Sequence, residues 1–196
     1  MRMKIAKNCR IAAALLLLSL LLTCLAGCKF GAPSDEEVRL ILSEKLPVAK
    51  ELLTVIYGEG IPLADGSTID ESWTTPHYYK VAEDFQYQSI ADLKKAAAEV
   101  FSADYLEIVY EYAFEGTDDY MPRFAEDGGV LTMDVVKEPM GLLAEVYPDT
   151  ATVISGSRYA CKVEVECLSA TGKTVKETVS LSRGEDGGWL FDSAVY

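Results

Sequence analysis

The sequence has a single histidine, His77, and lacks the short motifs that usually carry catalysis. The patterns G-x-S-x-G and H-E-x-x-H and the glycine-rich phosphate loops are all missing. A histidine that acts as a general base needs a nucleophile and an orienting group within reach, and no sequence signature supplies them. We therefore expect His77 to lie in a loop or at a strand edge beside Tyr78 and Tyr79, and we predict that the chain is not an enzyme.

Cysteine is scarce after residue 28, where Cys161 and Cys167 are the only two. The segment between them alternates apolar and polar residues, which is typical of a strand with one buried face. Six residues of extended strand separate the two thiols by roughly 20 Å, whereas a disulfide needs Cα atoms about 4.4–6.8 Å apart. The pattern predicts two buried thiols and no bridge. Without a second Cys or His cluster, we expect no metal site and no cofactor.

Long hydrophobic runs are absent except from Ile11 to Leu22, which is shorter than the roughly 20 residues that a membrane-spanning helix needs. Four basic residues and no acid precede this run, and the lipobox Leu25-Ala26-Gly27-Cys28 follows it. This arrangement predicts a lipoprotein signal peptide over residues 1–27, lipid on Cys28 and a tether over residues 28–33. The protein would then be held on the extracytoplasmic face of a bacterial membrane. An uncleaved anchor, or an ordinary signal with a chance cysteine, is the alternative.

Basic residues are outnumbered, with 18 Lys and Arg against 31 Asp and Glu and a formal charge of −13. Loss of residues 1–27 would remove four basic residues and no acid, making the charge four units more negative. Such a surface repels nucleic acid, and it favours cationic partners by raising their encounter rate. Solubility alone is the other explanation of this charge.

Helical patterns dominate the first half of the remaining chain. Ser34-Asp35-Glu36-Glu37 is a capping box that opens a helix ending near Gly58 and Gly60, and Pro47 is expected to kink it or split it in two. Ser89 opens a second helix. Ser102 caps a third helix, expected over residues 103–113.

Strand patterns dominate the second half. Short strands are expected at 77–82 and 123–125, and a hairpin turn at 126–129 leads to a strand at 130–133. A short helix or irregular stretch is expected at 137–143, and the remaining strands at 151–155, 159–169, 174–182 and 189–196. Helices followed by an antiparallel meander predict an α+β fold, with one sheet face wet and the other covered by helices. Residues 34–196 would form one domain, with a helical lobe over about 34–116 and a β-rich lobe over about 120–196.

Acidic pairs occur in predicted turns at Asp118-Asp119, Glu126-Asp127 and Glu185-Asp186. Paired carboxylates serve glycoside hydrolysis, and turn acids can bind calcium, but no D-x-D-x-D-G series is present. We expect these acids to be solvated. Tyrosines cluster around the third helix and suit either an interface or the core; they are Tyr105, Tyr110, Tyr112 and Tyr120.

The order of residues between 77 and 133 resembles the IseA-type family of inhibitors of bacterial cell-wall DL-endopeptidases. The resemblance lies in Tyr78-Tyr79-Lys80-Val81, in Ser89 to Lys95, in Val100 to Tyr105 and in Pro122 to Leu131. It implies an α+β domain of two lobes with a cleft that blocks a papain-like peptidase non-covalently. It also implies that an acidic loop beside the cleft contacts the enzyme. We place that loop at Glu115, Asp118, Asp119 and Tyr120, or at Glu126 and Asp127. One departure is the lipobox, because the inhibitor that the chain resembles is secreted free.

Two functions are therefore open. The first is a lipoprotein that binds a cationic cell-wall hydrolase through its acidic loops. The alternative is a ligand-binding lipoprotein with a cystatin-like or NTF2-like fold, which would need a deep apolar pocket.

Overall fold

The computed structural model describes residues 31–64, 76–137 and 145–195, and its fold is α+β, as the sequence predicts. The predicted signal peptide and Cys28 lie outside these residues, as does most of the expected short helix at 137–143. The helices are α2 (Asp35–Tyr57), α3 (Ile90–Ala98), α4 (Ala103–Tyr110) and the π-helix η2 (Glu111–Glu115). The strands are β1 (Tyr78–Lys80), β2 (Phe124–Asp127), β3 (Val130–Asp134), β4 (Glu145–Gly156), β5 (Ala160–Leu168), β6 (Thr174–Arg183) and β7 (Trp189–Phe191). They form two antiparallel sheets, ordered β1-β3-β2 and β4-β5-β6-β7.

Helix α2 begins at the predicted capping box. The side chain of Ser34 accepts a hydrogen bond from the backbone N–H of Glu37, and the Glu37 carboxylate accepts one from the N–H of Ser34. Pro47 was expected to kink this segment or to split it in two, and the split is excluded because α2 is one continuous helix through Pro47. Pro47 and Ser43 are both exposed. The carbonyl of Ser43, which loses its donor to the proline, can therefore be hydrated.

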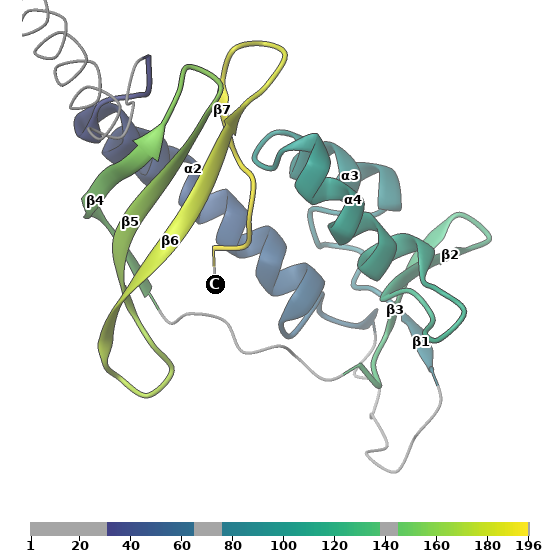
Figure 1. The fold of residues 1–196 in the computed structure, drawn as a ribbon. Helices are drawn as coiled ribbons and strands as arrows, with labels where there is room; N and C mark the ends of the chain where they lie inside the picture. The colour runs from purple at the N-terminus through teal and green to yellow at the C-terminus, as the bar shows by residue number, and fades with distance from the viewer. Residues whose placement is uncertain (1–30, 65–75, 138–144, 196) are drawn as a thin grey trace, which may run out of the picture.

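The four-stranded sheet buries one face against α2 (Figure 1). On β5 the buried residues are Cys161, Val163, Val165 and Cys167, while the alternate residues are exposed or half-buried. This confirms the predicted strand face, and both thiols are free. Strand β4 starts earlier than the expected 151–155. A register irregularity between Tyr147 and Thr152 makes room for Pro148, which cannot donate to the ladder.

The three-stranded sheet contains the predicted hairpin. Gly128 and Gly129 join β2 to β3 with φ angles of 59° and 82°. Two left-handed residues in a two-residue loop match the twist of the flanking strands, which explains why both positions are glycine. Strand β1 pairs with the other edge of β3, with Tyr79 opposite Met133. His77 lies immediately before β1, at the strand edge where the sequence placed it.

Strand β7 connects the four-stranded sheet with helices α3 and α4. The N–H of Phe191 donates to the carbonyl of Val100, and the N–H of Ser102 donates to the carbonyl of Phe191, both at 2.8 Å. These bonds attach the α3–α4 joint to the four-stranded sheet, and the rings of Phe101 and Phe191 pack beside them. The division into a helical lobe over about 34–116 and a β-rich lobe over about 120–196 stays a prediction. None of the helices in the described ranges is long and apolar enough to cross a bilayer.

Candidate functional site

The exposed face of α4 and η2 carries acids and no base. Asp104, Glu107, Glu111 and Glu115 are all exposed and recur at helical spacing; we call these four residues the acidic stripe. Between them lies Ile108, which is 63% exposed although it is large and apolar. The opposite face holds Tyr105, Leu106 and Val109, which are buried in the core.

Local sequence fixes the start of this face. The hydroxyl of Ser102 caps α4 by accepting from the N–H of Tyr105 at 3.2 Å. Ser102 is itself anchored, because its hydroxyl donates to the carboxylate of Asp192 beyond β7.

The helix was expected to run to Ala113, but it ends as α4 at Tyr110 and continues as η2 to Glu115. The N–H of Gly116 donates to the carbonyl of Glu111 at 2.7 Å, which closes the wide turn. Gly116 has a φ of 70°, and a Cβ there would lie 2.7 Å from the carbonyl oxygen of Tyr120. π-Helical turns are rare and often occur at functional sites.

A tyrosine cage lies beside η2; we define it as the rings of Tyr112 and Tyr120. The Nζ atom of Lys137 lies 4.2 Å from the centroid of Tyr112 and 4.7 Å from that of Tyr120. The hydroxyl of Tyr120 donates to Glu111 of the acidic stripe at 3.1 Å. The ring of Tyr57, at the end of α2, lies 4.9 Å from that of Tyr112. The cage therefore already holds one cation by cation–π attraction.

A second cation sits on the other side of η2. Lys94 of α3 lies 4.5 Å from the ring centroid of Tyr110 and 3.8 Å from the carboxylate of Glu115. This ion pair is largely exposed, so it adds little to stability. Both lysines show that the aromatic and acidic side chains of this region can bind ammonium groups.

The second predicted acidic segment reaches the same helix α3. The carboxylate of Glu126 accepts a hydrogen bond from the N–H of Ile90 at 2.8 Å, where a negative charge favours the helix dipole. Glu115 contacts Lys94, one turn further along α3. Asp127 is exposed next to the hairpin turn. The two acidic segments that the sequence singled out thus contact neighbouring turns of helix α3.

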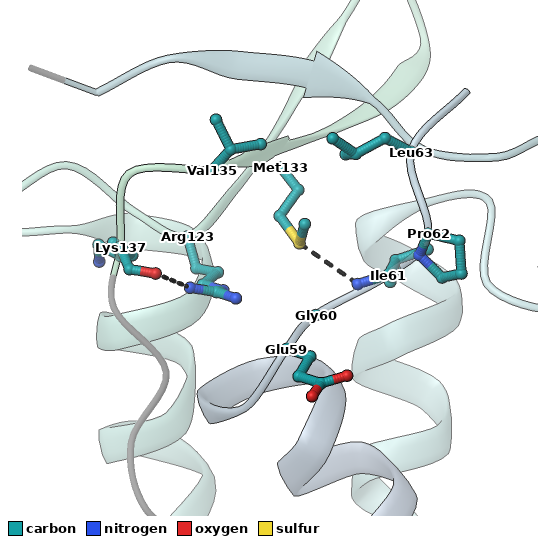
Figure 2. A pocket seen from close by; sticks show the side chains of 9 residues that line it. All are labelled: Glu59, Gly60, Ile61, Pro62, Leu63, Arg123, Met133, Val135 and Lys137. Atoms are coloured by element: carbon teal, nitrogen blue, oxygen red, sulfur yellow. Dashed lines mark hydrogen bonds between the residues drawn. The ribbon is translucent and has the colours of Figure 1, made fainter. Parts of the chain in front are cut away.

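Next to the cage is a pocket of about 440 Å³ (Figure 2). Arg123 and Lys137 lie on one side of it, and Pro62 and Leu63 lie on the other. The remaining lining residues are Glu59, Gly60, Ile61, Met133 and Val135. The wall is mostly apolar, with a guanidinium at one side.

The guanidinium of Arg123 ties distant segments together. One terminal nitrogen donates to the carbonyl of Lys137 at 2.9 Å, and the other donates to the carbonyl of Gly58 at 2.8 Å. Arg123 is only 2% exposed. Within the described parts of the chain, its Nε atom and the Nζ atom of Lys137 are buried without a hydrogen-bond partner. Burial lowers the pKa of both side chains, because it penalises the charged form.

Asp134 supplies the opposing charge. Its side chain is buried, and its carboxylate accepts hydrogen bonds from the N–H groups of His77 at 3.0 Å and Val136 at 3.1 Å. Its negative charge partly restores the pKa of Arg123 and of Lys137. Burial, together with this carboxylate, raises the pKa of Tyr78 to about 12. A buried cluster of opposite charges therefore underlies the cage and the pocket.

The structure places each acid and tyrosine that the sequence predicted to contact a partner. Glu115, Tyr120 and Glu126 make the contacts described above, while Asp118 and Asp119 are exposed in the loop after η2. The sequence did not single out Lys137, Arg123 or Asp134 as site residues. No periodicity marks them, although an arginine between Pro122 and Phe124 at the start of a predicted strand could have drawn attention. His77 is absent from the pocket lining in the described ranges.

Compared with known proteins, the chain matches no family model. It also matches no curated relative. The resemblance of residues 77–133 to the IseA-type family therefore stays a prediction.

Proposed function

We propose that this chain is a lipid-anchored extracytoplasmic protein that binds a cationic protein partner through the acidic stripe, next to the tyrosine cage. The partner we favour is a papain-like cell-wall DL-endopeptidase, which the protein would inhibit or regulate without a covalent bond. The observation that carries the proposal is the acid-only exposed face of α4 and η2, next to aromatic rings that already hold an ammonium group.

The acidic stripe is unfavourable for the isolated helix. Glu107 and Glu111 are four residues apart, as are Glu111 and Glu115, and like charges at this spacing destabilise a helix by about 0.2–0.5 kcal/mol a pair. A basic surface on a partner would relieve this repulsion. It would also find the stripe quickly, because opposite charges steer association.

Charge alone gives little affinity, which usually comes from a few apolar or aromatic anchors. Ile108 supplies an apolar anchor within the acidic stripe. Met121, which is 54% exposed, supplies another directly after Tyr120. Both are large side chains exposed beside acids, which is the composition expected of an interface core with a charged rim.

The test is association with purified extracellular wall hydrolases of the same organism, followed by a wall-lysis assay. We expect the full-length protein to bind one such peptidase and to slow lysis. Replacing Glu107 and Glu111 by lysine should lower the association rate by about tenfold or more at low salt, and added salt should remove the difference.

The matched control replaces Glu177 and Glu185 by lysine, which changes the net charge equally on exposed positions of β6 and of the turn after it. We expect a much smaller loss of rate for this variant. An equal loss for both variants would reject the acidic stripe as the binding face. Absence of any complex and of any slowing of lysis would reject the inhibitor itself.

A second function has one observation in its favour. The pocket of about 440 Å³ is mostly apolar with Arg123 at one side, which suits a small amphipathic carboxylate. If this ligand-binding function is correct, an aliphatic carboxylate should protect the protein against thermal unfolding. A leucine in place of Val135 should then reduce that protection by narrowing the pocket.

A further inference from the structure

The tip of the β4–β5 hairpin differs in composition from the rest of this acidic chain. No acid occurs between Asp149 and Glu164, and the segment carries Arg158 and Lys162, both exposed. Two large apolar or aromatic residues are also exposed there, Ile154 at 47% and Tyr159 at 61%. We call residues 154–162 the hairpin tip.

The hairpin tip lies beside the beginning of the described chain. A Cβ built on Gly31 would be 3.1 Å from the Cβ of Arg158. Only two residues, Lys29 and Phe30, lie between Cys28 and Gly31, and the three steps of fully extended chain from Cys28 to Gly31 span at most about 11 Å. A lipid on Cys28 would therefore enter the bilayer within about 11 Å of Gly31, which lies next to Arg158.

The hairpin tip is an ordered surface. The N–H of Ser157 donates to the carbonyl of Ala160 at 2.7 Å, and the N–H of Arg183 donates to the carbonyl of Tyr159 at 2.7 Å. The guanidinium of Arg158 stacks 4.5 Å from the ring centroid of Tyr159. The β4–β5 turn lies at the end of the sheet where α2 begins, whereas the β5–β6 turn lies at the opposite end (Figure 1).

From these observations we propose that the hairpin tip contacts the headgroup layer of the bilayer that holds the acyl chains of Cys28. This proposal rests on the lipid anchor of the proposed function. Tyrosine places its ring at the membrane interface, and arginine extends its charged group to the phosphates. The ring of Tyr159 and the side chain of Ile154 enter the layer, while Arg158 and Lys162 bind its phosphate groups.

Electrostatics selects the same orientation. A strongly acidic domain on a very short tether is repelled by anionic lipids at close range. The approach is least unfavourable where the acid-free hairpin tip faces the bilayer. Acids border the tip on two sides, at Asp35 to Glu37 in the first turn of α2 and at Glu185 and Asp186 on the β6–β7 turn. The contact is therefore confined to the tip and does not extend over the whole end of the sheet.

The experiment uses the full chain, produced with its lipid and placed in vesicles of phosphatidylcholine and phosphatidylglycerol. A tryptophan at the tip, Tyr159→Trp, reports contact through quenching by bromine atoms on the lipid acyl chains. We expect most of the added emission to be lost in brominated vesicles. Thr171→Trp, in the exposed β5–β6 turn at the far end of the sheet, is the matched control and should keep its emission.

Ile154→Trp gives a second report from the same tip if Tyr159→Trp does not fold. Unquenched emission from the tip, or equal quenching at the tip and at position 171, would overturn the proposal. Mass spectrometry of Cys28 separates the two hypotheses. A lipidated protein with an unquenched tip would reject the membrane contact alone and leave peptidase binding standing, whereas a Cys28 without lipid would reject both the anchor and the contact.

Discussion

Arg123 is the largest side chain that the described core encloses completely. A buried cation is expensive unless several groups compensate it. Here two backbone carbonyls accept from the guanidinium, and the carboxylate of Asp134 opposes its charge. Arg123 thereby connects the end of α2, through Gly58, to the segment that follows β3, through Lys137. The residue serves the fold first, and through Lys137 it also positions the tyrosine cage.

Replacement of Arg123 by methionine tests this role. The change leaves the carbonyls of Gly58 and Lys137 without their donor and removes one of the two cations that oppose the buried carboxylate of Asp134, so we expect a loss of about 3–5 kcal/mol in the free energy of unfolding. Urea denaturation measures it. Arg158→Met, at an exposed position, is the control and should change the stability by less than about 0.5 kcal/mol. A similar small change for both would show that Arg123 is dispensable.

Ionisation of Cys161 is expected to lower the stability of the fold at alkaline pH. Burial raises the pKa of its thiol from 9.0 to about 11. Between these values the folded state keeps a proton that the unfolded state releases, so stability falls as the pH rises from 9 towards 11. Each pH unit in that window costs about 1.4 kcal/mol for this group. Denaturation at a series of pH values should show a smaller slope for Cys161→Ala than for the wild type.

Val163→Ala is the matched control for that slope. It removes atoms from the same buried strand face, has no titratable side chain and leaves the thiol of Cys161 in place. Cys167 is not a suitable control, because burial raises the pKa of its thiol as well. An identical slope in the wild type and in Cys161→Ala would contradict the assignment.

At the scale of elements, the start of α2 depends on two reciprocal hydrogen bonds between Ser34 and Glu37. Ser34→Ala removes one acceptor from the first turn, and we expect it to cost about 1 kcal/mol in the free energy of unfolding. Ser43→Ala, at an exposed position inside the same helix, is the control. Because alanine favours helix interiors, this variant should be neutral or slightly stabilising. Chemical denaturation measures both variants. An equal loss in the free energy of unfolding for the two would show that the cap formed by Ser34 does not stabilise the protein.

Helix caps and tight turns could be predicted from the sequence, because they depend on residues that are close together in the chain. Ser34, Ser89 and Ser102 cap α2, α3 and α4 as expected, because a cap is decided by residues within one turn. The hairpin turn was also predictable, since Gly128 and Gly129 adopt the left-handed conformation that glycine tolerates.

Features with distant causes could not be predicted. The continuity of α2 depends on Pro47 facing solvent, which depends on the packing of the opposite face. The cage and the pocket depend on Arg123 reaching Gly58, which is 65 positions away in the sequence. No period or spacing carries such information, so the sequence missed the buried cations of the site. Of the acidic stripe it singled out only Glu115.

At the scale of the molecule, α2 packs against β4 and contacts α3, while β7 binds the α3–α4 joint. Strand β2 of the three-stranded sheet packs in turn against α3 and η2. The two sheets are therefore connected through the helices between them, and we expect them to unfold together. Far-UV circular dichroism and the emission of Trp189, with Trp73 replaced by phenylalanine, should give coincident urea transitions. Two separate transitions would show instead that the sheets belong to independent units.

The length of α2 has a consequence for where the protein can act. A helix rises about 1.5 Å a residue, so the 23 residues of α2 hold Tyr57 some 33 Å from Asp35 along the axis. Tyr57 packs on the ring of Tyr112, whereas Asp35 accepts a hydrogen bond from Val153 next to the hairpin tip. Under the proposed membrane contact and peptidase binding, α2 would set a fixed distance between the bilayer and the bound enzyme. Enzymes confined to the outer layers of the wall, farther from the membrane, would then stay out of range.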